Sequence, residues 1–267
     1  MPGVLPDFLI IGGMKCGTTS LYAWLAEHPS VRRTRKEIRY FSQRTRYAYG
    51  ENWYRAHFPE HEPGRTWITG EGSPAYLFVP DAPERAAKLV PHAKLIALLR
   101  DPVERARSHW SHQFRRGIES EDLDSTMRRA LRCETAGGRS PNLDGTPPDP
   151  RDRQDSHLAR GRYAEQLERW LTYYDRDSLL VLDSAELFER PVPTLNRVLD
   201  FLGLPPYPKL PELTVHGSRT DSATMRPETR ELLRDYFEPF NRQLYRLLRR
   251  DLGWDRPAPD RSAVGAE

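Results

Sequence analysis

The sequence predicts an α/β protein with a P-loop-like three-layer fold, in which helices flank a central, mainly parallel sheet. Short apolar runs alternate with stretches of helical periodicity, the pattern of parallel strands joined by crossover helices. The first run, FLIIG at 8–12, leads directly into a glycine-containing loop and then a helical stretch. A second run, KLIALL at 94–99, is apolar enough for a central strand. These observations favour one compact α/β domain.

The first two elements are defined by their flanking residues. The strand at 8–12 lies between Pro6-Asp7 and the glycines that follow it. The next stretch, 18–28, repeats apolar residues at helical spacing, and Pro29 ends it. The other expected elements, in chain order, are a strand at 67–70, a helix at 82–90, a strand at 94–99, a helix from Asp101-Pro102 to about 116, a helix at 163–174, a strand at 179–182, and helices at 193–202 and 228–248.

Composition limits the domain organisation. We expect a single domain over 1–254 of the 267 residues. Residues 133–155 lack hydrophobic periodicity and are crowded with proline, glycine and charge, so they predict a flexible insertion loop. Residues 255–267 predict a disordered tail.

Charge and cysteine content limit the function classes. Forty-one Lys and Arg against 38 Asp and Glu give a net charge of +3, too small for a chain that binds nucleic acid over its whole surface. The apolar run at 8–14 is too short to span a membrane, and we expect no membrane span. Two cysteines cannot build a disulfide framework, which favours a reduced, cytoplasmic protein. The Arg-, Pro- and Ala-rich composition leans towards a bacterial tailoring enzyme for natural products.

The loop IIGGMKCGTTS at 10–20 has the form of a phosphate cradle with a displaced lysine. Loops that bind nucleoside triphosphates read G-x-x-x-x-G-K-[ST], with lysine after the second glycine. Gly12 and Gly17 have that separation, but Lys15 lies between them. A strand, a glycine loop and a helix start present backbone N–H groups and a positive dipole end to an anion. The alternative is a tight turn with a solvated lysine.

A second motif, RDPVERARS at 100–108, follows the apolar run at 94–99. It places Arg100 at the carboxyl end of a buried strand, where open α/β sheets bind ligands, and Ser108 about two turns into the next helix. The planar guanidinium of arginine suits a phosphate. An ion pair between Arg100 and Asp101 that caps the helix is the structural alternative.

Both motifs resemble those of the PAPS-dependent sulfotransferases, nearest the branch of heparan-sulfate N- and 3-O-sulfotransferases and its bacterial relatives. PAPS is 3′-phosphoadenosine 5′-phosphosulfate, the sulfuryl donor. Residues 6–31 resemble the first signature of that family, and 100–108 match its second, R-D-P-x-x-R-x-x-S. The resemblance assigns the 5′-phosphosulfate of the donor to Lys15, Gly17, Thr18, Thr19 and Ser20. It assigns the 3′-phosphate to Arg100 and Ser108, and a loop that closes over the nucleotide to the region of Arg219.

KEIRYF at 36–41 resembles the family pattern whose glutamate deprotonates the acceptor, which makes Glu37 the expected base. Glu71 is a secondary acid/base candidate, with a structural role against the sheet as the alternative. The sequence departs from the family at Gly72, where the animal enzymes carry a lysine that assists catalysis. Either Lys15 performs that function alone or another residue substitutes. His157 could face the acceptor, whereas His109 and His112 are expected to be surface or packing residues.

The sequence therefore predicts a sulfotransferase that moves a sulfuryl group from PAPS to a hydroxyl or amine of a small-molecule or glycan acceptor. The product nucleotide is adenosine 3′,5′-bisphosphate (PAP), and no metal is expected, since no Cys/His or acidic cluster has ligand spacing. One alternative is a P-loop small-molecule kinase that uses ATP. Another is a non-enzymatic module that binds polyanions through its basic residues Arg32, Arg33, Arg35, Lys36 and Arg39.

Overall fold

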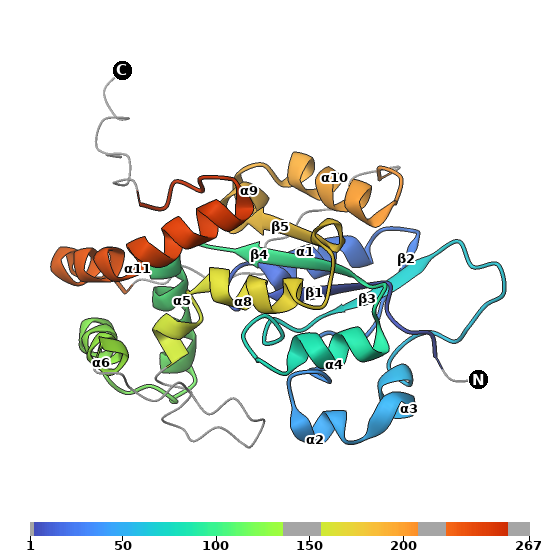
Figure 1. Cartoon of the computed structure of the whole chain (residues 1–267), viewed down its shortest axis with the longest axis horizontal. Helices are drawn as coiled ribbons and strands as arrows, with labels where there is room; N and C mark the ends of the chain where they lie inside the picture. Colours follow the sequence, from blue (N-terminus) through green and yellow to red (C-terminus); the bar gives the residue numbers. More distant parts are fainter. Residues whose placement is uncertain (1–2, 136–155, 208–222, 256–267) are drawn as a thin grey trace.

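The computed structural model describes residues 3–135, 156–207 and 223–255. Its centre is a five-stranded sheet with the order β2-β3-β1-β4-β5, and every neighbouring pair of strands is parallel. The strands are β1 (Phe8–Gly12), β2 (Val31–Arg32), β3 (Ile68–Gly72), β4 (Lys94–Leu99) and β5 (Leu179–Asp183). Helices cover both faces of this sheet (Figure 1), which confirms the predicted fold class.

Alternation along the central strands divides the core into two layers, because successive side chains of a strand point to opposite faces. Phe8 and Ile10 of β1 pack with α1 (Thr18–Ala26) and α10 (Pro191–Leu202) on one face. Leu9 and Ile11 pack on the other face, towards α4 (Ala82–Leu89) and α8 (Tyr163–Leu171). All four side chains are fully buried. The apolar runs are continuous because both faces of the sheet are covered.

A third apolar cluster lies beside the sheet and joins three helices (Figure 1). These helices are α5 (Pro102–Arg115), α6 (Leu123–Thr135) and α11 (Pro227–Leu248). Trp110 of α5, Met127 of α6 and Phe237 of α11 belong to the same buried group. The cluster fixes α5, which starts at the carboxyl end of β4, and brings α11 from the far end of the chain against it.

The predicted strands at 8–12 and 94–99 coincide with β1 and β4, and the strand at 67–70 corresponds to β3. The last long helix begins one residue earlier than expected, and α10 begins two residues earlier. The short elements β2, α2 (Arg44–Tyr47), α3 (Gly50–Arg55), η1 (Arg176–Ser178) and α9 (Ser184–Glu189) were not predicted. They have two to six residues each, too few to display a periodicity.

Helix α6 was also missed, although Leu123, Met127 and Ala130 have helical spacing and are buried. Its last three residues, 133–135, fall within the segment predicted to be a loop. The rest of that segment, 136–155, and the tail from 256 lie outside the described residues. Among the helices of the described ranges, none has the length and apolarity to cross a lipid bilayer.

Candidate active site

The loop between β1 and α1 turns tightly so that the helix start faces the carboxyl edge of the sheet. Gly17 precedes α1 with φ 92°, and a Cβ there would lie 2.8 Å from the ring of Phe188. Only glycine combines that backbone conformation with that close approach. Lys15 also has positive φ, 70°, which is uncommon for a residue with a side chain. The loop is therefore held in a specific shape at the positive end of a helix, as an anion site requires.

The three hydroxyl residues at the start of α1 have different environments. Thr18 and Ser20 are buried, whereas Thr19 is exposed. The Thr19 hydroxyl accepts a hydrogen bond from the Lys36 ammonium group. Thr19 is therefore the hydroxyl of this turn that faces the neighbouring loop.

The second motif lies against the first. Arg100 follows β4 directly, and its Nη1 donates to the Lys15 carbonyl oxygen at 3.4 Å. Asp101 caps α5 by accepting from the backbone N–H groups of Val103 and Glu104 at 2.8 and 3.2 Å. The carboxylate near Arg100 is that of Glu104, at 3.9 Å, so the ion pair expected as an alternative involves a different acid.

Glu104 is surrounded by arginines. Arg107 donates to it at 2.9 Å, and Arg230 of α11 does so at 2.6 Å. Burial disfavours the charged form of Glu104, yet Arg230 and Arg107 hold its pKa below its ordinary value. Glu104 thus gathers the guanidinium groups of three arginines next to the start of α5, the helix that carries the buried Ser108.

Glu37 lies on a strained loop, residues 34–41, that crosses the carboxyl end of β3. Its backbone N–H donates to the Gly72 carbonyl at 3.1 Å. Its carboxylate, 37% exposed, accepts a hydrogen bond from Arg39 and lies 3.9 Å from the Lys36 ammonium group. Glu37 and Arg39 have φ 60° and 57°, so two residues with side chains occupy the left-handed region here. Such conformations cost of order 1 kcal/mol each and cluster at functional sites.

Glu71 of β3 has the opposite environment. Its side chain is 0% exposed and accepts from the hydroxyls of Tyr54, Ser73 and Tyr76 at 3.0, 2.6 and 2.5 Å. Burial raises the pKa of Glu71, and those hydrogen bonds together with one from the Ile38 N–H oppose the rise. Because its oxygen atoms are occupied and enclosed, Glu71 has the structural role rather than contact with an acceptor.

The Glu71 network also fixes the loop that carries Glu37. The Ser73 hydroxyl, which donates to Glu71, accepts from the Arg39 backbone N–H at 3.0 Å. Ile38 donates to Glu71 from the same loop. The two residues that follow Glu37 are therefore tied to one buried carboxylate, Ile38 directly and Arg39 through Ser73.

Several other titratable groups of the candidate site and of α5 are buried. Burial raises the pKa of the Cys16 thiol to about 11, so it remains protonated at neutral pH. His109 and His157 pack ring against ring at 4.5 Å, and burial lowers the pKa of His157 to about 3. His157 is fully enclosed and does not face an acceptor. His112, half-buried on α5, has its pKa lowered by burial and by Lys15, and Glu37 acts in the opposite direction.

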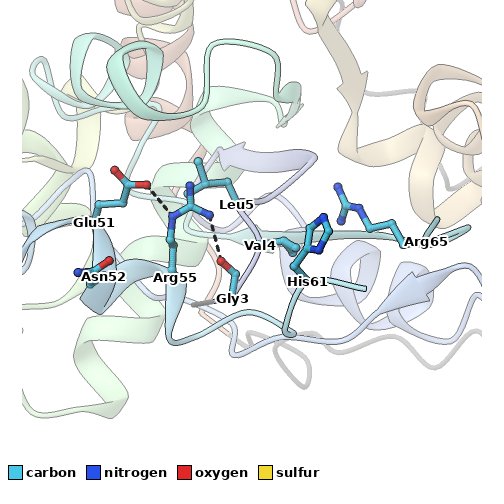
Figure 2. A pocket seen from close by; sticks show the side chains of 8 residues that line it. All are labelled: Gly3, Val4, Leu5, Glu51, Asn52, Arg55, His61 and Arg65. Carbon is cyan, nitrogen blue, oxygen red and sulfur yellow. Dashed lines mark hydrogen bonds and ion pairs between the residues drawn. The ribbon is translucent and has the colours of Figure 1, made fainter. Parts of the chain in front are cut away.

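A hollow of about 720 Å³ lies at the opposite end of β1, next to residues 3–5 (Figure 2). Its basic groups are paired within the chain. Arg55 donates to the Gly3 carbonyl and to Glu51, and Arg65 is paired with Asp7 at 2.7 Å. The hollow lies at the other end of β1 from the glycine loop at 12–17, and its lining includes none of the predicted site residues, so the carboxyl edge is the candidate active site.

Four of the five basic residues considered for polyanion binding contact other side chains of the chain. Arg33 is 3.8 Å from Glu27, Arg32 lies over the ring of Trp67, and Lys36 and Arg39 belong to the Glu37 loop. Within the described ranges, no group of three or more His, Cys, Asp or Glu residues could hold a metal ion. Arg219 lies outside the described residues.

The structure therefore brings Lys15, Gly17, Thr19, Arg100 and Glu37 to one edge of the sheet. Thr18, Ser20 and Ser108 are buried in the helices beside them. The sequence did not indicate Lys36, Arg230 or His112 as part of this region. Lys36 is adjacent to Glu37, which was a usable signal. Arg230 lies 126 residues beyond its partner Glu104, and no local pattern reports such a contact.

Comparisons with known proteins agree with this geometry. Residues 5–230 match the family model described as the sulfotransferase domain. The chain is 36% identical over 209 residues to the bifunctional heparan sulfate N-deacetylase/N-sulfotransferase 3 of Homo sapiens. This alignment covers 76% of this chain and 23% of the relative. It is 31% identical over 273 residues to the heparan sulfate glucosamine 3-O-sulfotransferase 3B1 of Mus musculus, covering 94% of this chain and 65% of the relative.

A solved structure is similar over nearly the whole chain. The crystal structure of a sulfotransferase from Alicyclobacillus acidocaldarius superposes with a TM-score of 0.76 at 27% identity. The match covers 95% of this chain and 100% of that one. The sulfotransferase domain from the curacin biosynthetic pathway, at 16% identity and a TM-score of 0.50, shares the fold.

Proposed function

Because this chain belongs to the sulfotransferase domain family, we propose that it moves a sulfuryl group from PAPS to a hydroxyl or amine of a glycan acceptor and releases PAP. The observation that carries the proposal is the contact between two cationic motifs at the ends of neighbouring strands. Arg100 donates to the Lys15 carbonyl, so the loop before α1 and the start of α5 form one continuous site. A donor with phosphates at both its 5′ and 3′ positions suits such a site.

The 5′-phosphosulfate would lie on the loop before α1. The positive φ angles of Lys15 and Gly17 shape this loop so that the positive end of α1 points to the carboxyl edge of the sheet. Lys15 supplies a mobile ammonium group. The remaining contacts of this subsite would come from the backbone and hydroxyls of Gly17, Thr18, Thr19 and Ser20.

The 3′-phosphate would lie near Arg100 and Ser108. The guanidinium groups of Arg100, Arg107 and Arg230 around Glu104 support an anion here, because positively charged groups attract a phosphate. This subsite distinguishes the proposed donor from ATP, which has no 3′-phosphate. Arg219 is proposed to bind the nucleotide.

In the transfer, the acceptor oxygen or nitrogen forms a bond to sulfur while the bond from sulfur to the bridging oxygen of the 5′-phosphate breaks. The acceptor proton moves to the Glu37 carboxylate and then to solvent. A positioned base of this kind contributes about 10²- to 10⁴-fold. Lys15 and the loop N–H groups stabilise the charge that develops on the leaving oxygen. Positioning and electrostatics supply most of the rate, as in phosphoryl transfer.

The acceptor class is inferred from the relatives, whose names concern heparan sulfate. The chain spans 23% of the length of the human relative, so it carries only part of what that protein does. A glycan hydroxyl or amine is the proposed acceptor, and a small natural product is the alternative that the assay below distinguishes. We further propose that residues 1–254 form one domain and that the protein acts in the cytoplasm.

Calorimetry with PAP and with ATP tests the donor. We expect PAP to bind at least about tenfold more tightly than ATP, because the 3′-phosphate adds a charge-assisted contact. In Arg100→Ala this preference should disappear. Tighter binding of ATP, with a requirement for magnesium, would replace the proposal with the kinase alternative.

A transfer assay with sulfur-labelled PAPS tests the acceptor. Unsulfated heparosan, its N-deacetylated form and a panel of small phenols and alcohols are offered in parallel. Label in the glycans supports the proposal, and label confined to the small molecules would overturn its acceptor part.

A further inference from the structure

The ammonium group of Lys36 lies between the two halves of the candidate site. It donates a hydrogen bond to the Thr19 hydroxyl, on the first turn of α1, and lies 3.9 Å from the Glu37 carboxylate. The Lys36 side chain is 20% exposed, so its stem is largely covered while its end reaches the loop. One cation thus contacts both the helix start that faces the donor and the carboxylate that faces the acceptor.

Gly72 provides the space for this arrangement. A Cβ on Gly72 would lie 3.7 Å from Cε of Lys36, in ordinary van der Waals contact. A long side chain at position 72 would compete for the volume that the Lys36 stem fills. The loop is anchored there by the hydrogen bond from the Glu37 N–H to the Gly72 carbonyl. Lys36 is therefore directed over the end of β3 and towards α1 by contacts on both sides.

Three other charged groups act on Lys36. Burial lowers the pKa of Lys36, Glu37 raises it, and the positive charges of Arg39 and Lys15 lower it further. Arg39 also pairs with Glu37, so the same carboxylate serves two cations while Lys15 lies nearby. Positive charges that lie close together where water is partly excluded raise the free energy unless an anion lies among them. The sulfuryl group, with its negatively charged oxygens, is such an anion.

We propose that Lys36 is a second catalytic cation, whose ammonium group exchanges the Thr19 hydroxyl for an oxygen of the sulfuryl group when PAPS binds and keeps that contact during transfer. This inference rests on the proposed function and deepens it. It names Lys36 as the residue that takes the place of the lysine that the animal enzymes carry at the position of Gly72. A lysine suits the role, since its flexible stem lets a compact charge follow the sulfuryl group as it moves from donor to acceptor. A positive charge placed beside a reacting group that carries negative charge is a large source of rate enhancement.

A purely structural role would have Lys36 only orient Glu37 through their ion pair. The two roles differ in what they do to the donor, because PAPS carries the sulfuryl group and PAP does not. The comparison is made in the Glu37→Gln background, where the ion pair is already removed and PAPS is consumed too slowly to disturb a binding measurement.

The experiment measures by calorimetry the affinities of Glu37→Gln and of Glu37→Gln/Lys36→Met for PAPS and for PAP. We expect the second change to weaken PAPS binding about tenfold, the value of one charge-assisted contact, and to leave PAP binding within about twofold. Equal losses for PAPS and PAP would overturn the inference, and so would no loss for either.

Turnover provides a second readout. Lys36→Met alone should lower kcat about 10²-fold, and Lys36→Arg should restore part of it because the charge returns with a different shape. Arg33→Met is the matched control, since Arg33 belongs to the same segment but pairs loosely with Glu27 at 3.8 Å and should keep full activity. Full activity of Lys36→Met would overturn the inference. A wild-type protein that neither binds PAP nor transfers label from PAPS would instead overturn the proposed function, and this inference with it.

Discussion

Glu37 and Glu71 lie on adjacent segments at one edge of the sheet, yet their carboxylates have opposite surroundings. Glu37 is on a loop, partly exposed, and its partners are the cations Arg39 and Lys36. Glu71 is at the end of β3, fully buried, and its partners are the hydroxyls of Tyr54, Ser73 and Tyr76. A carboxylate paired with mobile cations can exchange them for a ligand. A carboxylate that accepts from three buried hydroxyls cannot exchange them for a ligand, because those donors would then lack an acceptor.

This difference in surroundings indicates that the two acids have different roles. Glu71 holds the loop through Ser73 and Ile38, and the loop presents Glu37 in a conformation that a free chain would avoid. The stability of the network offsets the local strain at Glu37 and Arg39. Changes at Glu37 should therefore affect turnover without affecting stability, and changes at Glu71 should affect stability first.

The largest expected effect is on turnover, in Glu37→Gln. We expect kcat to fall about 10³-fold because the acceptor proton loses its base. The free energy of unfolding should change by less than about 0.5 kcal/mol, since the side chain is partly exposed and glutamine keeps its shape. Labelled-PAPS transfer and urea denaturation measure the two quantities. Glu51→Gln is the control, because Glu51 is also an exposed acid paired with an arginine. Full turnover in Glu37→Gln would remove this residue from the mechanism.

The next largest effect is on stability, in Glu71→Ala. Removing the carboxylate leaves three buried hydroxyls and a backbone N–H without their acceptor, which should cost about 3 kcal/mol of unfolding free energy. Glu71→Gln keeps one acceptor oxygen and should cost less. Both are measured by urea denaturation, with PAP affinity as a check that the donor site survives. A Glu71→Gln protein of normal stability but without turnover would reverse the roles of the two acids.

The smallest effect is expected in Ser73→Ala, which cuts the link between the two regions. The Ser73 hydroxyl donates to Glu71 and accepts from the Arg39 N–H, so its loss should cost about 1 kcal/mol. Turnover should fall several-fold because the Glu37 loop is less well fixed. Ser42→Ala is the matched control, since that hydroxyl makes only a long bond of 3.4 Å to the Arg39 carbonyl. If Ser73→Ala lowered stability with turnover unchanged, the network would not position Glu37.

The parts of the site that the sequence predicted are those built from contiguous residues. Gly17 and Lys15 lie between a strand and a helix whose limits are readable from their apolar patterns, and Arg100 directly follows another such strand. Parallel strands place their carboxyl ends at one edge, so the meeting of these motifs follows from the fold class. The prediction that His157 could face the acceptor was wrong, because burial depends on how α5 and the segment before α8 pack.

The sequence by itself determined the α/β class and the two strand-to-helix motifs, because each depends on residue type and spacing within a short stretch. Its resemblance to the sulfotransferases made Glu37 the candidate base. Only the tertiary structure decided that Glu71 is a support rather than an acid, that Arg230 joins Glu104, and that Lys36 fills the space over Gly72. Each of these outcomes includes at least one contact between residues 17 or more positions apart, and the longest spans 126 positions. Packing brings such residues together. A glutamate has the same local sequence pattern whether its side chain lies in solvent or in the core.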